Sequence, residues 1–164
     1  MLYFSYGSNM SSKRLLQRVP SARFVTVATL LKHQLKFHKS SKNDGSAKCN
    51  IAENGNLDSF VIGVVFNISE SEKPVLDRVE GLNFGYNLKQ VNLFSILGES
   101  LTAFTYYATD IDSTLKPFHW YKNHVIKGAE EFNLPRHYIE KIINVESIDD
   151  NNQKRCAIES AIYD

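Results

Sequence analysis

Residues 6–9, Tyr-Gly-Ser-Asn, are the first candidates for chemistry, because they end an N-terminal strand-like run on a turn-forming sequence. Gly7 permits backbone conformations that other residues resist. Successive backbone N–H groups in a tight turn that leads into a helix can bind an anion. Ser8 or Asn9 can instead cap that helix. Tyr6 to Asn9 alone therefore fit either an anion site or a plain turn with a cap.

Glu80 is the second candidate, because it is predicted at the end of a helix, immediately before Gly81. A carboxylate there faces the negative end of the helix dipole, which would raise its pKa. A raised pKa suits a general base or proton shuttle near neutral pH. The alternative is a solvated surface glutamate that is neutralised by Arg78 or Lys73.

Tyrosines form the third group of candidates: Tyr6, Tyr86, Tyr106, Tyr107 and Tyr121. Alternate residues of a strand face opposite sides, so Tyr106 and Tyr107 cannot both face inward. An inward hydroxyl could hold a ligand or a carboxylate. Each tyrosine taken singly also fits an ordinary core or rim position.

Other kinds of chemistry have no support in the sequence. The five histidines show no zinc-like spacing with one another or with Cys49 or Cys156, so no metal and no cofactor is expected. No nucleophile motif, P-loop or dinucleotide-binding glycine pattern is present. A net charge of +1 argues against a nucleic-acid or membrane-surface partner. Without a signal peptide, a membrane span or paired cysteines, the chain is expected in the reducing cytoplasm.

The elements that must position these residues follow from hydrophobic periodicity and turn signals. Strands are predicted at 2–6, 22–38 (one long or bent strand), 49–53, 59–69, 86–97 and 101–109, with a polar loop at 40–48 and hairpin turns at 54–56 and 98–99. Helices are predicted at 11–18, 69–81, 117–132, 135–145 and 150–162. Ser69 and Glu72 have the spacing of a capping box, and Gly81 is the expected helix stop.

This order predicts an α+β fold in which residues 1–164 form a single domain. Hairpins, rather than regular helical crossovers, join most of the strands. We therefore expect a small mixed or antiparallel β-barrel surrounded by helices.

Three stretches carry a resemblance to a known family. "YFSYGSNM" (3–10) resembles the signature loop of the γ-glutamylcyclotransferase-like family, and "LDRVEG" (76–81) is similar to the helix end that carries its catalytic glutamate. "YKNHVIKGAEE" (121–131) and "LPRHYIEKI" (134–142) look like the C-terminal helices of the branch that acts on γ-glutamyl amino acids. The stretches occur in the family's order, and the resemblance extends over nearly the whole chain.

The resemblance implies a cofactor-free reaction of the lyase or acyltransferase type, as in glutathione metabolism. The α-amine of a γ-glutamyl group attacks its own γ-amide, closing 5-oxoproline and releasing an amino acid. Glu80 corresponds to the catalytic acid and base. Residues 6–9 correspond to the loop that binds the glutamyl carboxylate and the developing oxyanion, and Tyr106 and Tyr121 match family tyrosines. The branch is often dimeric, so a homodimer is expected.

One position departs from the family pattern. The family carries a tyrosine seven residues after the catalytic glutamate, where this chain has Asn87, and Tyr86 stands one residue earlier. A small shift in the loop 81–86 would bring Tyr86 into that place. Two alternatives remain beside a cyclotransferase for γ-glutamyl amino acids. One is a cyclotransferase for γ-glutamylamines or a γ-glutamyl-capped biosynthetic intermediate, and the other is a non-catalytic metabolite-binding protein.

Overall fold

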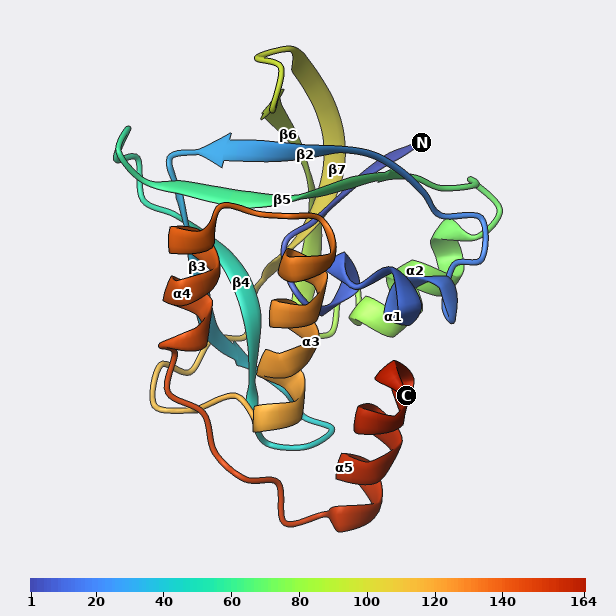
Figure 1. Cartoon of the computed structure of the whole chain (residues 1–164), viewed down its shortest axis with the longest axis vertical. Helices are drawn as coiled ribbons and strands as arrows, with labels where there is room; N and C mark the ends of the chain where they lie inside the picture. Colours follow the sequence, from blue (N-terminus) through green and yellow to red (C-terminus); the bar gives the residue numbers. More distant parts are fainter.

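Five strands close into a barrel in the computed structural model, which describes all residues from Met1 to Asp164 (Figure 1). Around the barrel the order is β1 (Leu2–Ser5), β5 (Phe60–Asn67), β2 (Arg23–Leu31), β6 (Tyr86–Ser95) and β7 (Ser100–Ala108). Strand β1 runs parallel to β7, and the other neighbouring pairs are antiparallel. The predicted α+β fold with a small mixed barrel is therefore confirmed.

Gly63 allows β1 and β5 to approach each other at the barrel wall. A Cβ atom at this position would lie 2.4 Å from the carbonyl oxygen of Ser5 and 2.7 Å from the ring of Phe4. Phe4 is fully buried, and the apolar residues of β5 pack beside it in the core. The nearly continuous apolar run at 59–69 is thus a central strand, as predicted.

A second sheet holds two strands outside the barrel, β3 (His33–Ser40) and β4 (Ala47–Glu53). The prediction of one strand over 22–38 is wrong, because the chain turns at Lys32, which has a φ of 61°. The predicted hairpin at 54–56 is also wrong. Strand β4 pairs with β3, so residues 54–59 carry the chain from one sheet to the other.

Helix α2 (Lys73–Glu80) connects β5 to β6 and ends at Gly81, as predicted. Gly81 has a φ of 74°, the left-handed conformation that glycine adopts at helix ends. The predicted capping box is wrong. The Glu72 carboxylate accepts hydrogen bonds from the backbone N–H and hydroxyl of Ser21, and so fixes the start of α2 to the segment before β2.

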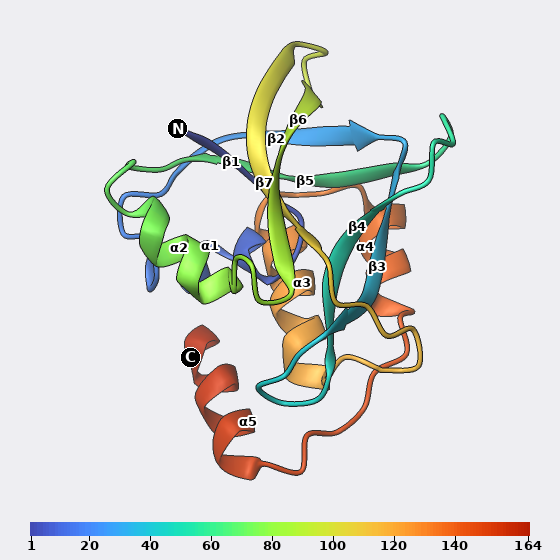
Figure 2. The same ribbon diagram turned by 180° about the vertical axis from the view of Figure 1, so that it is seen from behind.

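The remaining helices lie on one side of the barrel (Figures 1 and 2). They are α1 (Ser12–Leu16), which follows a 3-10 helix at Ser8–Met10, α3 (His119–Glu131), α4 (Arg136–Ile143) and α5 (Gln153–Ser160). Helix α3 packs directly against the 3-10 helix, and its Gly128 faces the backbone of Met10 and Ser11. None of the helices has both the length and the apolar character needed to span a lipid bilayer.

Helix α5 is attached near the N-terminal segment by charged and aromatic side chains. Glu159 lies 2.5 Å from Arg14 Nη1 and 2.8 Å from His124 Nε2, while the Tyr163 hydroxyl lies 2.8 Å from His124 Nδ1. Burial is the main cause that lowers the pKa of His124. Burial alone would raise the pKa of Glu159, but the hydrogen bond from His124 and the charge of Arg14 outweigh it and lower that pKa to about 2.

Candidate active site

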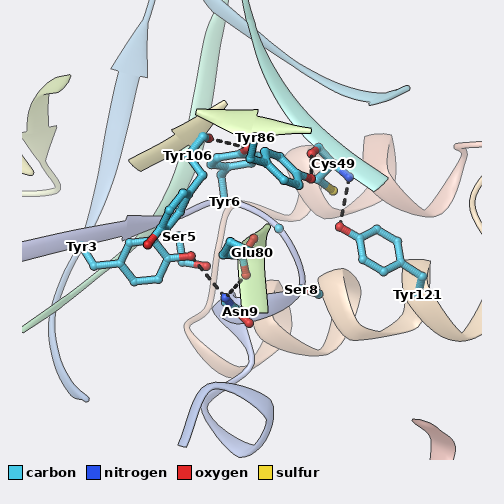
Figure 3. A pocket seen from close by; sticks show the side chains of 11 residues that line it. Tyr3, Ser5, Tyr6, Ser8, Asn9, Cys49, Glu80, Tyr86, Tyr106 and Tyr121 are labelled. Carbon is cyan, nitrogen blue, oxygen red and sulfur yellow. Dashed lines mark hydrogen bonds between the residues drawn. The ribbon is translucent and has the colours of Figure 1, made fainter. Parts of the chain in front are cut away.

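A pocket lies where β1, the loop after it, β4 and the end of α2 meet (Figure 3). It brings together eight of the nine candidate residues singled out from the sequence, all except Tyr107. They come from four separate parts of the chain: Tyr6, Gly7, Ser8 and Asn9; Glu80 and Tyr86; Tyr106; and Tyr121. Tyr3, Ser5 and Cys49 complete the wall.

Glu80 enters the pocket from the last residue of α2, and its side chain is 18% exposed. Its Oε1 accepts a 2.6 Å hydrogen bond from Asn9 Nδ2, while its Oε2 has no hydrogen-bond partner in the protein. The alternative interpretation, a surface glutamate neutralised by Arg78 or Lys73, is wrong, because Lys73 pairs with Asp77 and Arg78 is exposed without an ion pair. The second oxygen of Glu80 is thus available to a ligand.

Arg18 is the cation nearest to Glu80, although it contacts Glu80 mainly through Asn9. Its Nη1 donates a 2.7 Å hydrogen bond to Asn9 Oδ1 and lies 3.7 Å from Glu80 Oε1. Asn9 Nδ2 also donates a long, 3.3 Å hydrogen bond to the hydroxyl of Tyr3. The Asn9 side chain, which is 3% exposed, is therefore held on both sides and orients the carboxylate (Figure 3).

The loop 6–9 is built differently from the sequence prediction in two respects. Ser11 occupies the N-cap position of α1 and has no side-chain capping bond, so neither Ser8 nor Asn9 caps the helix. Gly7 has a φ of −120°, so it does not need the left-handed region. A small residue fits there because a Cβ atom would lie only 3.1 Å from Cys49 Cβ.

Three consecutive backbone N–H groups of this loop, those of Gly7, Ser8 and Asn9, have no hydrogen-bond acceptor within the protein. Ser8 and Gly7 line the pocket, and Asn9 is nearly inaccessible to solvent. Unpaired N–H groups beside a pocket are donors that a bound carboxylate or oxyanion can satisfy.

The hydroxyl groups of Tyr6, Tyr86 and Tyr121 bind the backbone. Tyr6 donates to the carbonyl oxygen of Tyr106 at 2.7 Å, and Tyr86 donates to that of Cys49 at 2.6 Å. The Tyr121 oxygen accepts a 3.0 Å hydrogen bond from Cys49 N–H, which leaves its own proton available to donate. Burial is the first cause that raises the pKa of each of the three, so these hydroxyls are neutral near pH 7.

Tyr106 and Tyr107 face opposite sides of β7, as the strand period requires. Tyr106 is 2% exposed, and its hydroxyl donates a 2.6 Å hydrogen bond to Asp77 Oδ1 on α2. Tyr107 lies outside the pocket, with the ammonium of Lys89 5.4 Å from its ring centre. Tyr106 therefore holds a carboxylate, that of Asp77, and ties β7 to the helix that carries Glu80.

Tyr86 occupies the pocket wall at the start of β6, whereas the next residue, Asn87, does not line the pocket. The turn 81–85 before Tyr86 contains three residues with positive φ: Gly81, Asn83 and Gly85. The chain thus supplies a tyrosine to the pocket although the position seven residues after Glu80 is an asparagine.

Three residues that line the pocket were not predicted from the sequence. Tyr3 and Ser5 lie on β1 two residues apart and so face the same side, a period that could have been extended back from Gly7. Cys49 is brought in by β4, which no local pattern places beside residues 6–9. Burial raises the pKa of Cys49 to about 12, so it remains a protonated thiol rather than a nucleophilic thiolate.

The pocket therefore offers one carboxylate, several neutral hydroxyls and a row of N–H donors. Glu80 is the only carboxylate in its wall. No three His, Cys, Asp or Glu side chains lie close enough together anywhere in the molecule to hold a metal ion. Such a set of groups can bind an anion and transfer a proton beside it.

Comparison with known proteins identifies a family and several similar enzymes. Residues 60–142 match the model of the AIG2-like family. The chain is 33% identical over 156 residues to the human gamma-glutamylcyclotransferase, with 90% of this chain and 80% of the relative covered. It is 33% identical over 153 residues to the bovine gamma-glutamylcyclotransferase, with the same coverage. A solved structure of a gamma-glutamyl cyclotransferase superimposes with a TM-score of 0.88 at 31% identity, covering 99% of this chain and 97% of that one.

Proposed function

This chain belongs to the AIG2-like family, among its γ-glutamylcyclotransferases, and from that premise we propose that it converts γ-glutamyl amino acids to 5-oxoproline and a free amino acid. The reaction is intramolecular. The α-amine of the glutamyl group forms a bond to its own γ-carbonyl carbon, and the γ-amide C–N bond then breaks. Attacking and leaving groups belong to one molecule, so binding it in a folded conformation supplies much of the rate.

The loop 6–9 would bind the negative end of the glutamyl group. The free N–H groups of Gly7, Ser8 and Asn9 support this role, because an α-carboxylate or the oxyanion of the tetrahedral intermediate would satisfy them. In other enzymes a single donor to the oxyanion is worth on the order of 10²–10³ in rate. The Tyr121 hydroxyl, with its proton free, is a further donor on the opposite wall.

Glu80 would move the proton. Its free Oε2 takes a proton from the α-amine as the ring closes and gives it to the departing nitrogen, so the carboxylate returns to its starting state. General acid–base catalysis of this kind contributes roughly 10²–10⁴ in rate. The observation that carries the proposal is this single carboxylate, oriented through one oxygen by Asn9 and open to the pocket through the other.

Comparing Glu80→Gln with Glu72→Gln tests the proposal. Both glutamates belong to α2 or its N-cap, but Glu72 binds Ser21 outside the pocket. Each purified protein is incubated with a panel of γ-glutamyl amino acids and γ-glutamylamines, and 5-oxoproline is followed by mass spectrometry. We expect release by the parent and by Glu72→Gln, and none by a folded Glu80→Gln. Substantial release by Glu80→Gln would disprove the role of Glu80, and silence of the parent across the panel would disprove the reaction.

The proposal also covers the location, the domain organisation and the oligomeric state of the enzyme. Two free cysteines, Cys49 and Cys156, support a reducing cytoplasmic location, and the family resemblance supports a part in glutathione metabolism. Residues 1–164 act as one domain, without a metal or cofactor, on a small-molecule substrate. The family resemblance supports a homodimer, which light scattering of the purified protein would test.

A further inference from the structure

A larger groove opens beside the pocket and shares Ser8, Glu80, Tyr86 and Tyr121 with it. If the proposed function is right, the glutamyl end of the substrate fills the small pocket and its γ-amide lies at Glu80. The leaving group must then extend past Glu80 into this groove. The side chains that line the groove therefore decide which leaving groups are accepted.

Cationic side chains dominate the groove. They are Arg14, Arg18, Lys39, Lys42, Lys48, Arg78 and Arg155, against the carboxylates of Asp44, Glu80 and Glu159. Four of these cations already form ion pairs: Arg14 with Glu159, Arg18 with Glu80, Lys48 with Asp44, and Arg155 with Asp150. Arg18 is held by Asn9.

Lys39 differs from the other cations of the groove. It is 9% exposed, yet its ammonium makes no hydrogen bond and no ion pair within the protein. The ammonium lies 4.9 Å from the ring centre of Tyr86, a residue shared by groove and pocket. Burial is the largest cause that lowers the pKa of Lys39, while the charges of Asp110 and Glu80 act in the opposite direction.

The lack of a side chain at Gly85 leaves room for the end of the Lys39 side chain. The φ of Gly85 is 125°, and a Cβ atom there would lie 3.0 Å from Lys39 Cε and 3.1 Å from Lys39 Nζ. The lysine thus runs between the backbone of Gly85 and the ring of Tyr86. A buried ammonium held in this way is costly unless an anion pairs with it.

We infer that Lys39 is a specificity-determining residue that binds the carboxylate of the leaving amino acid. This inference rests on the proposed function and refines it. The lysine lies on the leaving-group side of Glu80, it lacks a partner, and an amino acid brings the carboxylate that a simple amine lacks. The ion pair between Lys39 and this carboxylate would form only when substrate is bound. It would therefore favour leaving groups that carry a carboxylate.

Two substrates that differ by one carboxylate separate this role from a structural one. They are γ-glutamyl-alanine and γ-glutamyl-ethylamide, which has the same skeleton without the carboxylate. Lys39→Met is expected to lower kcat/KM for γ-glutamyl-alanine by ~10–100-fold, the usual effect of losing a charge-assisted hydrogen bond, and to leave γ-glutamyl-ethylamide nearly unchanged. Lys39→Arg is expected to restore part of the loss.

Lys89→Met is the matched control, because Lys89 also lies on a tyrosine ring, that of Tyr107, but outside the groove. Lys89→Met should leave kcat/KM unchanged for both substrates. If Lys39→Met loses the same kcat/KM for both substrates, or for neither, the inference is wrong. The proposed function then still stands, provided that the parent releases 5-oxoproline. Failure of the parent with both substrates overturns the proposed function itself. Circular dichroism and thermal unfolding confirm that each variant is folded.

Discussion

Asn9 Nδ2 donates a 2.6 Å hydrogen bond to Oε1 of Glu80, joining the loop after β1 to the last residue of α2 across 71 positions of the sequence. The side chain that could have capped the next helix instead orients the one carboxylate of the pocket. Arg18 fixes the other end of the amide at 2.7 Å. The loop and the helix end therefore work as one unit rather than as two separate motifs.

Replacing Asn9 by alanine is expected to lower kcat by ~10–100-fold with a smaller effect on KM, because a hydrogen bond to a charged group is lost and the carboxylate can rotate. Asn50 offers a matched control. It is also 3% exposed, but it bonds to His38 and to the backbone of Ala108. Asn50→Ala should lose stability and keep kcat. Steady-state kinetics with γ-glutamyl-alanine measure kcat and KM of both variants. Equal kcat values for the two variants would exclude an orienting role for Asn9.

Gly128→Ala is expected to destabilise the protein, although the same change in an exposed helix stabilises by about 1 kcal/mol. A Cβ atom at Gly128 would lie 2.4 Å from the backbone nitrogen of Ser11 and 2.6 Å from Met10. Overpacking against backbone costs ~1–3 kcal/mol and would shift the loop that precedes α1. Urea unfolding should show a lower midpoint than the parent. A higher midpoint would mean that α3 and the loop are not in close contact.

Tyr106→Phe is expected to lower the free energy of unfolding by ~1–3 kcal/mol, since the buried hydroxyl bonds to the charged Asp77. Its neighbour Tyr107 faces the other side of β7, so Tyr107→Phe should have little effect. Urea unfolding of the two variants measures the difference. Equal changes in the two variants would contradict the assignment of Tyr106 as the tie between β7 and α2.

Acid should loosen the attachment of α5 in two steps. The folded-state pKa of His124 is below 6.5, so only the unfolded chain binds a proton there as the pH first falls below 6.5, and stability decreases. The folded-state pKa of Glu159 is about 2 against an ordinary 4.5, so its stabilisation is complete above pH 4.5 and is lost as the pH falls towards 2.

Thermal unfolding between pH 3 and pH 8 measures these steps. Glu159→Gln should reduce the pH dependence of Tm below pH 4.5, and His124→Asn should reduce the part that begins near pH 6.5. A parent whose Tm does not change between pH 7 and pH 4.5 would contradict the assignment of His124, and one whose Tm does not change between pH 4.5 and pH 3 would contradict that of Glu159. Glu99→Gln, a change in the exposed β6–β7 hairpin, serves as the control.

Local sequence determined the type of nearly every element. Apolar periodicity and Gly81 define α2, and the apolar run of β5 marks a central strand. The wrong predictions concern which strands pair with one another. The break at Lys32 and the pairing of β4 with β3 depend on which sheet each strand joins, and no short-range pattern encodes that choice.

The sequence by itself supplied eight residues of the pocket together with Tyr107, which lies outside it, because a carboxylate at a helix end, a turn-forming tripeptide and strand tyrosines are visible as types and spacings. Only the tertiary structure decided how they act. It turned Asn9 from a cap into a donor to Glu80, gave the Tyr106 hydroxyl to Asp77, and left Lys39 without a partner beside the pocket. Hydrogen bonds and burial depend on groups far apart in the chain, so they become defined only when the barrel closes and the helices pack against it.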